Sequence, residues 1–317
     1  MTASRARASS VLIIANSAAG AVTSDRVLEV LDVCARHCDE VTVQWVGRER
    51  QERVEGRVVE GLARADLVVS VGGDGTAHWT ARQIVGAADR AEDRPALFVV
   101  PFGTGNSNYR NLWGDRPWQG ILRAAVTQPR LMVRHLDMAR VVETGELILL
   151  GAGSGLVADV LLLARGIEAT GRARYQAAVE RSALTHTPYQ GRVLVDGVEI
   201  QHGKTMLVNV GGGRYRAWQY DLLPHAEPDD GLLDVCVLGD SADPAALPEL
   251  LRHGLHVEQP GSAYARGREV VVERTDGNPL LFEHDGELRP ATGARVTVEL
   301  LEGILPTLSG KAPHVGD

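Results

Sequence analysis

Short apolar runs alternate with longer amphipathic stretches along the first part of the chain. β-branched residues are frequent in the runs, which is typical of buried strands at 11–15, 40–45, 67–71 and 97–100. Helical periodicity marks the stretches 24–37, 50–63, 77–88 and 118–127, the first of them with Ser24 as its predicted cap. This alternation predicts an α/β domain over residues 10–134, with a parallel sheet covered on both faces. Residues 1–8 are polar and are predicted to be a tail without regular structure.

The pattern changes after residue 134. Short β-branched runs separated by turn residues occur at 136–143, 146–151, 191–195, 205–210, 232–238, 269–274, 280–283 and 295–300. Their spacing predicts a mostly antiparallel, β-sandwich-like domain over residues 135–300, interrupted by helices at 158–184 and 244–253. Residues 301–317 are predicted to return to the first domain, with a disordered end from residue 309.

Two glycine-rich turns carry the strongest chemical signal. The first, Gly72-Gly73-Asp74-Gly75-Thr76, follows a predicted strand and precedes a predicted helix; the second, Gly103-Thr104-Gly105-Asn106, follows the next strand. Glycines at such positions let backbone amides and a helix N-terminus approach an anion closely. Two such turns at successive strand ends predict a nucleotide phosphate site. Asp74 would repel phosphate directly, so it suggests a bridging Mg²⁺ or its bound water.

With these turns, the chain resembles the family of the diacylglycerol kinase catalytic domain. The first turn alone is shared with NAD kinases and phosphofructokinases. Three further segments favour the diacylglycerol kinase family over these two classes: Asn209 with the glycines that follow it, Asp229-Asp230-Gly231, and Asp285-Gly286-Glu287. The resemblance extends from about residue 11 to residue 308. It implies an ATP- and Mg²⁺-dependent kinase that phosphorylates a hydroxyl of a lipid such as diacylglycerol or of a related hydrophobic alcohol.

The resemblance also implies roles for individual residues. Asp285 would be the general base, although the family also allows Asp74 in that role. Glu287 would contact a metal ion or the nucleotide, and Asn16 at the end of the first strand would be either a nucleotide contact or a turn cap. The nucleotide phosphates would be bound by Gly72, Gly73, Gly75, Thr76, Gly103, Thr104, Gly105 and Asn106. Taken alone, Asp285-Gly286 is more typical of a hairpin turn than of an active site.

A metal role is implied for a second group of acids. Asp229, Asp230 and Asp234 surround Gly231, where comparable loops of bacterial lipid kinases hold a structural Mg²⁺, and Asp74 is a further candidate ligand. The alternative is a solvated turn that enters the next strand. The chain departs from the family at two positions, with Ser17 in place of a proline and Ser107 in place of an aspartate.

Composition excludes several classes. The formal net charge of −8 argues against a nucleic-acid partner. Lys204 and Lys311 are the only lysines and neither is in a nucleotide motif, which excludes P-loop and protein kinases. No apolar run reaches the roughly 18 residues that span a bilayer. With only three cysteines and no signal peptide, a cytoplasmic protein is expected. A lipid acceptor would require transient contact with a membrane surface, and a homo-oligomer is left open.

Two other functions remain open at this point. The chain could phosphorylate a non-lipid alcohol, such as a secondary metabolite, or it could be a non-catalytic ligand-binding relative of the fold. The lining contributed by residues 153–167 and 175–184 would discriminate between acceptors: a deep apolar tunnel favours an acyl chain and a short polar pocket does not. NAD kinase is disfavoured because the C-terminal half matches the lipid kinases better.

Overall fold

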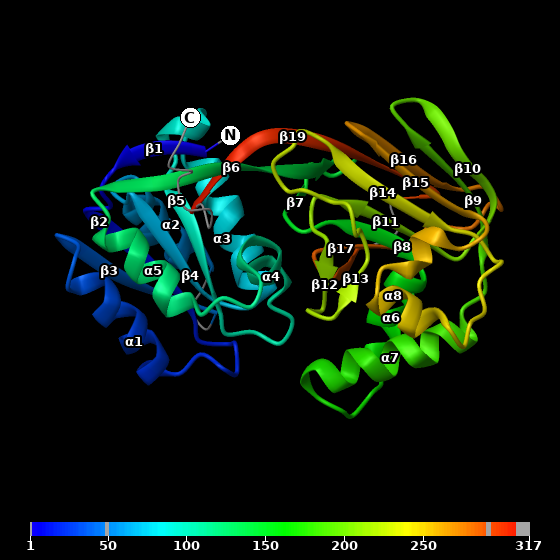
Figure 1. Cartoon of the computed structure of the whole chain (residues 1–317), viewed down its shortest axis with the longest axis horizontal. Helices are drawn as coiled ribbons and strands as arrows, with labels where there is room; N and C mark the ends of the chain where they lie inside the picture. The colour runs from blue at the N-terminus through cyan, green and yellow to red at the C-terminus, as the bar shows by residue number, and fades with distance from the viewer. Residues whose placement is uncertain (1, 48–50, 290–292, 309–317) are drawn as a thin grey trace. The chain divides into compact units, whose positions relative to one another are not determined.

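The computed structural model describes residues 2–47, 51–289 and 293–308, which form two compact units. Unit 1 contains residues 1–136 and 303–317, and unit 2 contains residues 137–302. Two strands, β6 (Arg130–Val141) and β19 (Arg295–Leu308), run from one unit into the other. The predicted fold class is confirmed, with a parallel sheet in unit 1 and antiparallel sheets in unit 2 (Figure 1).

Unit 1 is built on a parallel sheet with the strand order β19-β5-β4-β2-β3. Its two central strands consist almost entirely of buried apolar residues, because helices cover both faces (Figure 1). Helix α1 packs against α5, and α2 packs against α3. The elements are β1 (Thr2–Ala6), β2 (Ser10–Asn16), α1 (Ser24–Ala35), β3 (Glu40–Val46), α2 (Gln51–Leu62), β4 (Leu67–Gly72), α3 (Asp74–Ala87), the 3₁₀ turn η1 (Ala91–Asp93), β5 (Ala96–Pro101), α4 (Ser107–Trp113) and α5 (Trp118–Thr127).

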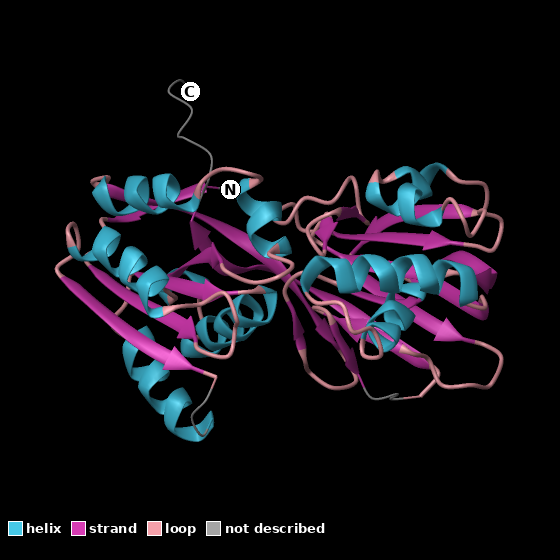
Figure 2. Cartoon of the chain, turned by 90° about the horizontal axis from the view of Figure 1, so that it is seen from below, coloured by secondary structure: helices cyan, strands magenta, loops and turns pink. Residues whose placement is uncertain are grey.

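Unit 2 contains two antiparallel sheets, one with the order β15-β14-β11-β8-β17-β18 and one that includes β10-β9-β16-β19. Helices α6 and α7 pack against each other (Figure 2). The elements are β7 (Leu147–Ile148), β8 (Ala152–Gly155), α6 (Leu156–Ala164), α7 (Gly171–Thr185), β9 (Tyr189–Val195), β10 (Val198–Thr205), β11 (Leu207–Gly211), β12 (Tyr215–Arg216), β13 (Tyr220–Asp221), β14 (Leu233–Leu238), α8 (Leu247–Arg252), the 3₁₀ turn η2 (Leu255–Glu258), β15 (Ser262–Gly267), β16 (Glu269–Arg274), β17 (Phe282–His284) and β18 (Glu287–Arg289).

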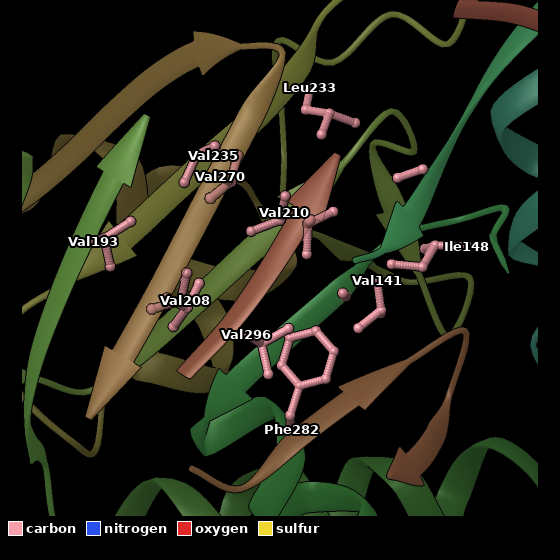
Figure 3. Packing of buried hydrophobic residues seen from close by; sticks show 14 of the residues in the cluster. Val141, Ile148, Val193, Val208, Val210, Leu233, Val235, Val270, Phe282 and Val296 are labelled. Atoms are coloured by element: carbon pink, nitrogen blue, oxygen red, sulfur yellow. The ribbon is translucent and has the colours of Figure 1, made fainter. Parts of the chain in front are cut away.

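The core of unit 2 follows from the alternation of side chains along its strands. Val208 and Val210 of β11 point into the cluster between the two sheets, together with Val270 of β16 (Figure 3). Leu207, one position away on β11, belongs to a second cluster that α6 and α7 complete. Successive side chains of a strand point to opposite faces, so β11 in the middle of the six-stranded sheet is buried on both sides.

Four local predictions differ from the structure. Residues 2–6 form β1, which pairs with β6, because a partner 128 residues away in the chain supplies the hydrogen bonds that a tail would lack. Thr23, and not Ser24, caps α1, accepting a hydrogen bond from the Arg26 amide. The single helix expected at 158–184 is two helices, broken between Ala164 and Gly171, and the one expected at 244–253 is only Leu247–Arg252.

Two predictions fall partly outside the described residues. Arg50, at the start of the helix predicted over 50–63, and the residues from 309 onward lie outside the described part of the chain. Helix α4, between the second glycine turn and α5, was not predicted. No helix within the described residues is both long and apolar enough to cross a membrane.

Asp66 joins the beginnings of two parallel strands in unit 1. Its Oδ2 accepts hydrogen bonds from the Ser9 amide at 2.8 Å, the Ser9 hydroxyl at 2.9 Å and the Ser10 amide at 2.9 Å. Asp66 directly precedes β4, and Ser10 begins β2. The carboxylate therefore satisfies backbone donors that the parallel ladder leaves without a partner.

We expect Asp66→Ala to lower the free energy of unfolding by about 2 kcal/mol, because three charge-assisted hydrogen bonds are lost. The matched control is Asp39→Ala, which removes an exposed ion pair with Arg7 and should cost less than about 1 kcal/mol. Urea unfolding of the full chain, followed by circular dichroism, measures both. Equal shifts of the two midpoints would contradict the assigned role of Asp66.

Candidate active site

The first glycine turn joins the buried strand β4 to helix α3. Gly73 precedes the helix with an extended backbone, and its carbonyl accepts the first helical hydrogen bond, from Ala77, at 3.0 Å. The amides of Asp74, Gly75 and Thr76 therefore lie in the first turn, where no intrahelical acceptor is available to them. These amides lie at the positive end of the α3 helix dipole and can bind an anion.

The second glycine turn is closed by its own asparagine. Asn106 adopts a left-handed backbone conformation with φ of 51°. Its Oδ1 accepts the Gly103 amide and its Nδ2 donates to the Gly103 carbonyl, both at 2.8 Å. Asparagine tolerates this conformation better than most residues because its side chain can bond locally. Asn106 therefore holds the Gly103–Gly105 loop in a fixed shape ahead of α4.

Backbone contact brings the two turns together. A Cβ atom on Gly103 would lie 2.2 Å from the Cα of Gly73, and one on Gly73 would lie 3.0 Å from the Cα of Gly103. The strand register leads to this contact, because Gly72 at the end of β4 pairs with Pro101 at the end of β5. Only glycine fits at such a separation. The structure thus places the two predicted turns side by side in unit 1.

Asp74 bridges the turns through a residue that the sequence did not point to. Its Oδ1 accepts hydrogen bonds from the Asn108 amide at 2.9 Å and from the Asn108 side chain at 3.1 Å. Asn108 lies on α4, two residues beyond Asn106, and it is buried. Ser107, which stands where the family has aspartate, is also buried. The partner of Asp74 could not be found from spacing, because the contact crosses 34 residues of chain.

Asn16 fixes the end of β2 next to the first turn. Its Oδ1 accepts the Ala18 amide at 2.9 Å, and its Nδ2 donates to the Thr76 hydroxyl at 2.9 Å. The capping role is therefore present in the structure, and a second contact ties Asn16 to a predicted phosphate-binding residue. Neither contact tests whether Asn16 binds a nucleotide.

In unit 2, Asp285 occupies a two-residue hairpin turn between β17 and β18. Asp285 and Gly286 have φ angles of 50° and 80°, as both central positions of a type I′ turn require. The carboxylate is buried, and its oxygens accept the amides of Leu150 at 2.6 Å and Leu149 at 3.0 Å. The orientation of Asp285 is therefore fixed by the backbone of its own turn and by the amides of Leu149 and Leu150.

Glu283 is a buried acid that sequence analysis passed over. Glu283 precedes Asp285 by two residues in the chain. Its Oε2 accepts a hydrogen bond from the Gly286 amide at 3.1 Å, and this bond closes the same hairpin. Burial, opposed by the nearby Arg216 guanidinium, raises the pKa of Glu283 to about 7. The available signal was an acid at the end of an otherwise apolar strand, a position where a charge is costly unless it has a purpose.

The strands next to Glu283 leave further polar groups buried. Glu283 pairs with Gly153 of β8, which pairs in turn with Asn209 of β11. The Asn209 Nδ2 and both terminal nitrogens of Arg216 are buried and make no hydrogen bond to any described residue. Buried polar atoms without a protein partner commonly bind ordered water or a ligand. A polar region thus lies in the interior beside the Asp285 hairpin.

Glu287 follows Gly286 and is exposed. Its carboxylate forms an ion pair with the Arg289 Nη2 at 3.2 Å, while the Arg289 Nε donates to His284 Nε2 at 2.8 Å. These contacts join both strands of the hairpin. Glu287 also lines a pocket of unit 2.

The aspartates around Gly231 are engaged with other side chains. Asp230 forms an ion pair with Arg266, and the fully buried Asp234 accepts the Tyr264 hydroxyl at 2.7 Å. Burial raises the pKa of Asp234. Among the described residues, no three ligating atoms within 4.8 Å of one another include Asp229, Asp230 or Asp234. The structure does not bring these three carboxylates together, and their role as metal ligands stays a prediction.

Comparisons with known proteins cover both halves of the chain. Residues 10–141 match the family model described as the diacylglycerol kinase catalytic domain, and residues 152–307 match the YegS C-terminal NAD kinase beta sandwich-like domain. The chain is 28% identical over 270 residues to a Pseudomonas aeruginosa protein named "Probable lipid kinase YegS-like", covering 84% of this chain and 82% of that protein. It is 26% identical over 230 residues to the diacylglycerol kinase of Bacillus subtilis, covering 71% and 72%.

Solved structures have the same fold at lower sequence identity. One Bacillus anthracis structure matches with a TM-score of 0.77 at 22% identity, over 98% of both chains. Another, named as a diacylglycerol kinase, matches with a TM-score of 0.68 at 18% identity, over 98% of this chain and all of its own.

The glycine contact in unit 1 can be tested by adding one methyl group. We expect Gly103→Ala to lower the free energy of unfolding by about 2 kcal/mol, because its Cβ would overlap the backbone of Gly73. Gly86→Ala is the control, since nothing lies within 4 Å of a Cβ at that exposed position of α3 and alanine favours helix. Urea unfolding that shows equal midpoints for Gly103→Ala and the unaltered chain would refute the contact.

Glu283 makes stability depend on pH in a defined window. Its pKa is about 7 in the folded chain against 4.5 for an ordinary glutamate, so the folded state keeps a proton that the unfolded state loses between these values. The free energy of unfolding of the unaltered chain should therefore fall, relative to Glu283→Gln, as pH rises from 4.5 to 7. The expected difference is on the order of 3 kcal/mol.

Urea unfolding at several pH values between 4 and 8 checks this dependence. The exposed Glu287→Gln is the control and should leave the pH profile of the unaltered chain in place. A constant difference between the chain and Glu283→Gln across the range would show that the buried carboxyl does not titrate there.

Proposed function

We propose, from the premise that this chain belongs to the family of the diacylglycerol kinase catalytic domain, that it is an ATP- and Mg²⁺-dependent kinase of a lipid hydroxyl. As a member of that family the chain is a phosphotransferase with an alcohol group as acceptor. The nucleotide, the metal ion, the acceptor and the residue roles are parts of the proposal. The acceptor would be diacylglycerol or a related hydrophobic alcohol.

The backbone contact between Gly73 and Gly103 is the observation that carries the proposal. It places the two glycine turns, together with the amides in the first turn of α3, next to each other in unit 1. Phosphoryl transfer depends mainly on positioning the phosphates and stabilising their charge. Amides fixed by strands and helices can do this without a lysine, which fits a chain that has no lysine in either turn.

Asp74 is the proposed ligand for Mg²⁺ or its bound water. Its carboxylate lies at the phosphate turn, and the two hydrogen bonds from Asn108 hold one oxygen in place. This donor set fits Mg²⁺, which is commonly bound by one or two carboxylates together with water and substrate phosphates. When bound, the ion would neutralise charge on the phosphates. The residues Asn16, Thr76, Gly103 and Asn106 would shape the surrounding phosphate site.

Asp285 is the proposed general base that accepts the proton of the acceptor hydroxyl. The amides of Leu149 and Leu150 orient its carboxylate, and each oxygen of an ionised carboxylate can accept more than one hydrogen bond. A base held at a fixed angle loses little entropy when the acceptor arrives. Glu283, which closes the hairpin through Gly286, would hold the turn in the same position.

The chain contains a matched control for the alternative that Asp285 serves only as a hairpin-turn residue. Asp196 and Gly197 form another two-residue turn, between β9 and β10, with φ angles of 49° and 78°. The Asp196 Oδ1 also accepts two backbone amides, from Arg268 and Glu269, at 2.8 and 2.9 Å. Asp196 is exposed, whereas Asp285 is buried. Any effect that comes only from weakening an Asp-Gly turn should therefore appear at both positions.

We expect Asp285→Asn to lower the rate of phosphorylation by at least about 100-fold, the usual contribution of a general base. Asp196→Asn should stay within about twofold. The assay incubates the full chain with Mg²⁺-ATP and a panel of diacylglycerol, sphingoid bases, other lipid alcohols and hydroxylated metabolites, and detects phosphorylated products by mass spectrometry.

Circular dichroism of each variant shows that it is folded. Equal losses in the two variants would reduce the role of Asp285 to that of a turn residue. Full activity of Asp285→Asn would move the general base to Asp74. If no acceptor is phosphorylated by folded protein, the lipid kinase proposal fails for this panel.

A further inference from the structure

Unit 2 has a pocket next to the Asp285 hairpin. Its volume is about 340 Å³, and it lies between the end of α6, the start of α7 and the β17–β18 turn. Its walls include Leu161, Arg165, Arg174, Tyr175, Glu287 and Leu288. Ligand pockets commonly measure about 300–1,000 Å³, so this one is at the small end. It is neither a deep apolar tunnel nor a purely polar cavity.

The two arginines of this pocket differ from most arginines of unit 2. Arg192, Arg214 and Arg274 form ion pairs with acids at 2.6, 2.6 and 2.8 Å. Neither Arg165 nor Arg174 forms an ion pair with any residue in the described ranges 2–47, 51–289 and 293–308. Arg181 and Arg216 of unit 2 also lack an ion pair within these ranges, so the distinguishing feature of Arg165 and Arg174 is that both line the same pocket.

One hydrogen bond holds the Arg174 side chain in place and leaves its terminal nitrogens able to bind a ligand. Its Nε donates to the Ala169 carbonyl at 2.7 Å, and its terminal nitrogens make no hydrogen bond to any described residue. The acid of the pocket, Glu287, has its own partner in Arg289 at 3.2 Å. Neither of the two guanidinium groups therefore forms an ion pair with Glu287, the carboxylate that lines the pocket with them. Two planar guanidinium groups suit a phosphate or a carboxylate, which accepts several hydrogen bonds at once.

The rest of the wall is suited to hydrocarbon. Leu161, Tyr175 and Leu288 of the lining are partly buried. Apolar surface and a cationic end in one small pocket favour a ligand with an anionic group and a short apolar part inside. A neutral lipid alcohol would leave both guanidinium groups unpaired and partly desolvated, which weakens its binding.

We infer that this pocket binds an acidic amphiphile through Arg165 and Arg174. This inference rests on the proposed function and narrows its acceptor: among the hydrophobic alcohols proposed there, it selects one that carries a phosphate or carboxylate group over neutral diacylglycerol. Gly286 also lines the pocket, so an acceptor bound there lies against the turn that contains the proposed base. The half-buried Arg174 would contribute more than the exposed Arg165, because water screens it less.

Direct binding tests this inference without requiring catalysis. Isothermal titration calorimetry of the full chain, without nucleotide or Mg²⁺, would compare decyl phosphate, decyl maltoside, decyltrimethylammonium and inorganic phosphate, each below its micelle concentration. We expect decyl phosphate to bind at least about tenfold more tightly than the other three probes. Arg174→Gln should weaken it about tenfold and Arg165→Gln less. Arg181→Gln, an exposed arginine of α7 outside the pocket, should change it less than twofold.

Three results would overturn the inference. Equal binding of decyl phosphate and decyl maltoside would show that charge does not select the ligand. Equal weakening by Arg174→Gln and Arg181→Gln would show a general charge effect of the helix. Binding of inorganic phosphate as tightly as decyl phosphate would show that the pocket binds an anion without recognising the alkyl chain.

The experiments distinguish a failure of the binding inference from a failure of the proposed kinase function. Phosphorylation of neutral diacylglycerol together with no preference for decyl phosphate would keep the proposed function and reject the acidic acceptor. Selective binding of decyl phosphate together with no phosphorylated product, from a panel that also contains lipid alcohols with a phosphate group, would support the pocket and reject the kinase.

Discussion

The candidate site of unit 1 depends on one constraint, the contact between the backbones of Gly73 and Gly103. Parallel pairing brings the ends of β4 and β5 to the same edge of the sheet, but side chains would normally hold the two following turns apart. Glycine at both positions removes that obstacle. Asn106 then shapes one turn from within, Asn108 ties it to Asp74, and Asn16 connects the first turn to β2. A set of neutral side chains thus positions backbone amides that can face an anion.

Unit 2 shows that the same turn chemistry can serve two purposes. Asp196-Gly197 and Asp285-Gly286 have nearly the same backbone angles, and each aspartate accepts two amides. Only the second turn is buried beside an acid with a raised pKa and beside polar atoms that have no protein partner. A protein interior tolerates such groups at a cost, so their concentration around one hairpin is better explained by a function than by the turn.

Periodicity was enough to predict the two kinds of sheet, because strand and helix spacing is a local property of the chain. The glycine turns were also predictable, since their residue types have a specific conformational use. Sequence reasoning failed where a distant partner decides the outcome. Residues 2–6 are a strand because β6 pairs with them, Asn108 matters because Asp74 is near, and Glu283 titrates unusually because the sheet buries it. Around Gly231 too, spacing did not indicate the contacts that the structure shows, those of Asp230 with Arg266 and of Asp234 with Tyr264. The role of these acids as metal ligands stays a prediction.

Acceptor selection illustrates this limit most clearly. The chain is rich in arginine, so composition alone makes no arginine special. Once the side chains are placed, most arginines of unit 2 form an ion pair with an acid, and among the few that do not within the described residues, two line the same small pocket. An unpaired cation is informative only against that background, because pairing satisfies a charge locally and leaves nothing for a ligand. The chemistry of an acceptor pocket is therefore better indicated by the charges that the fold leaves unneutralised than by the number of charges in the sequence.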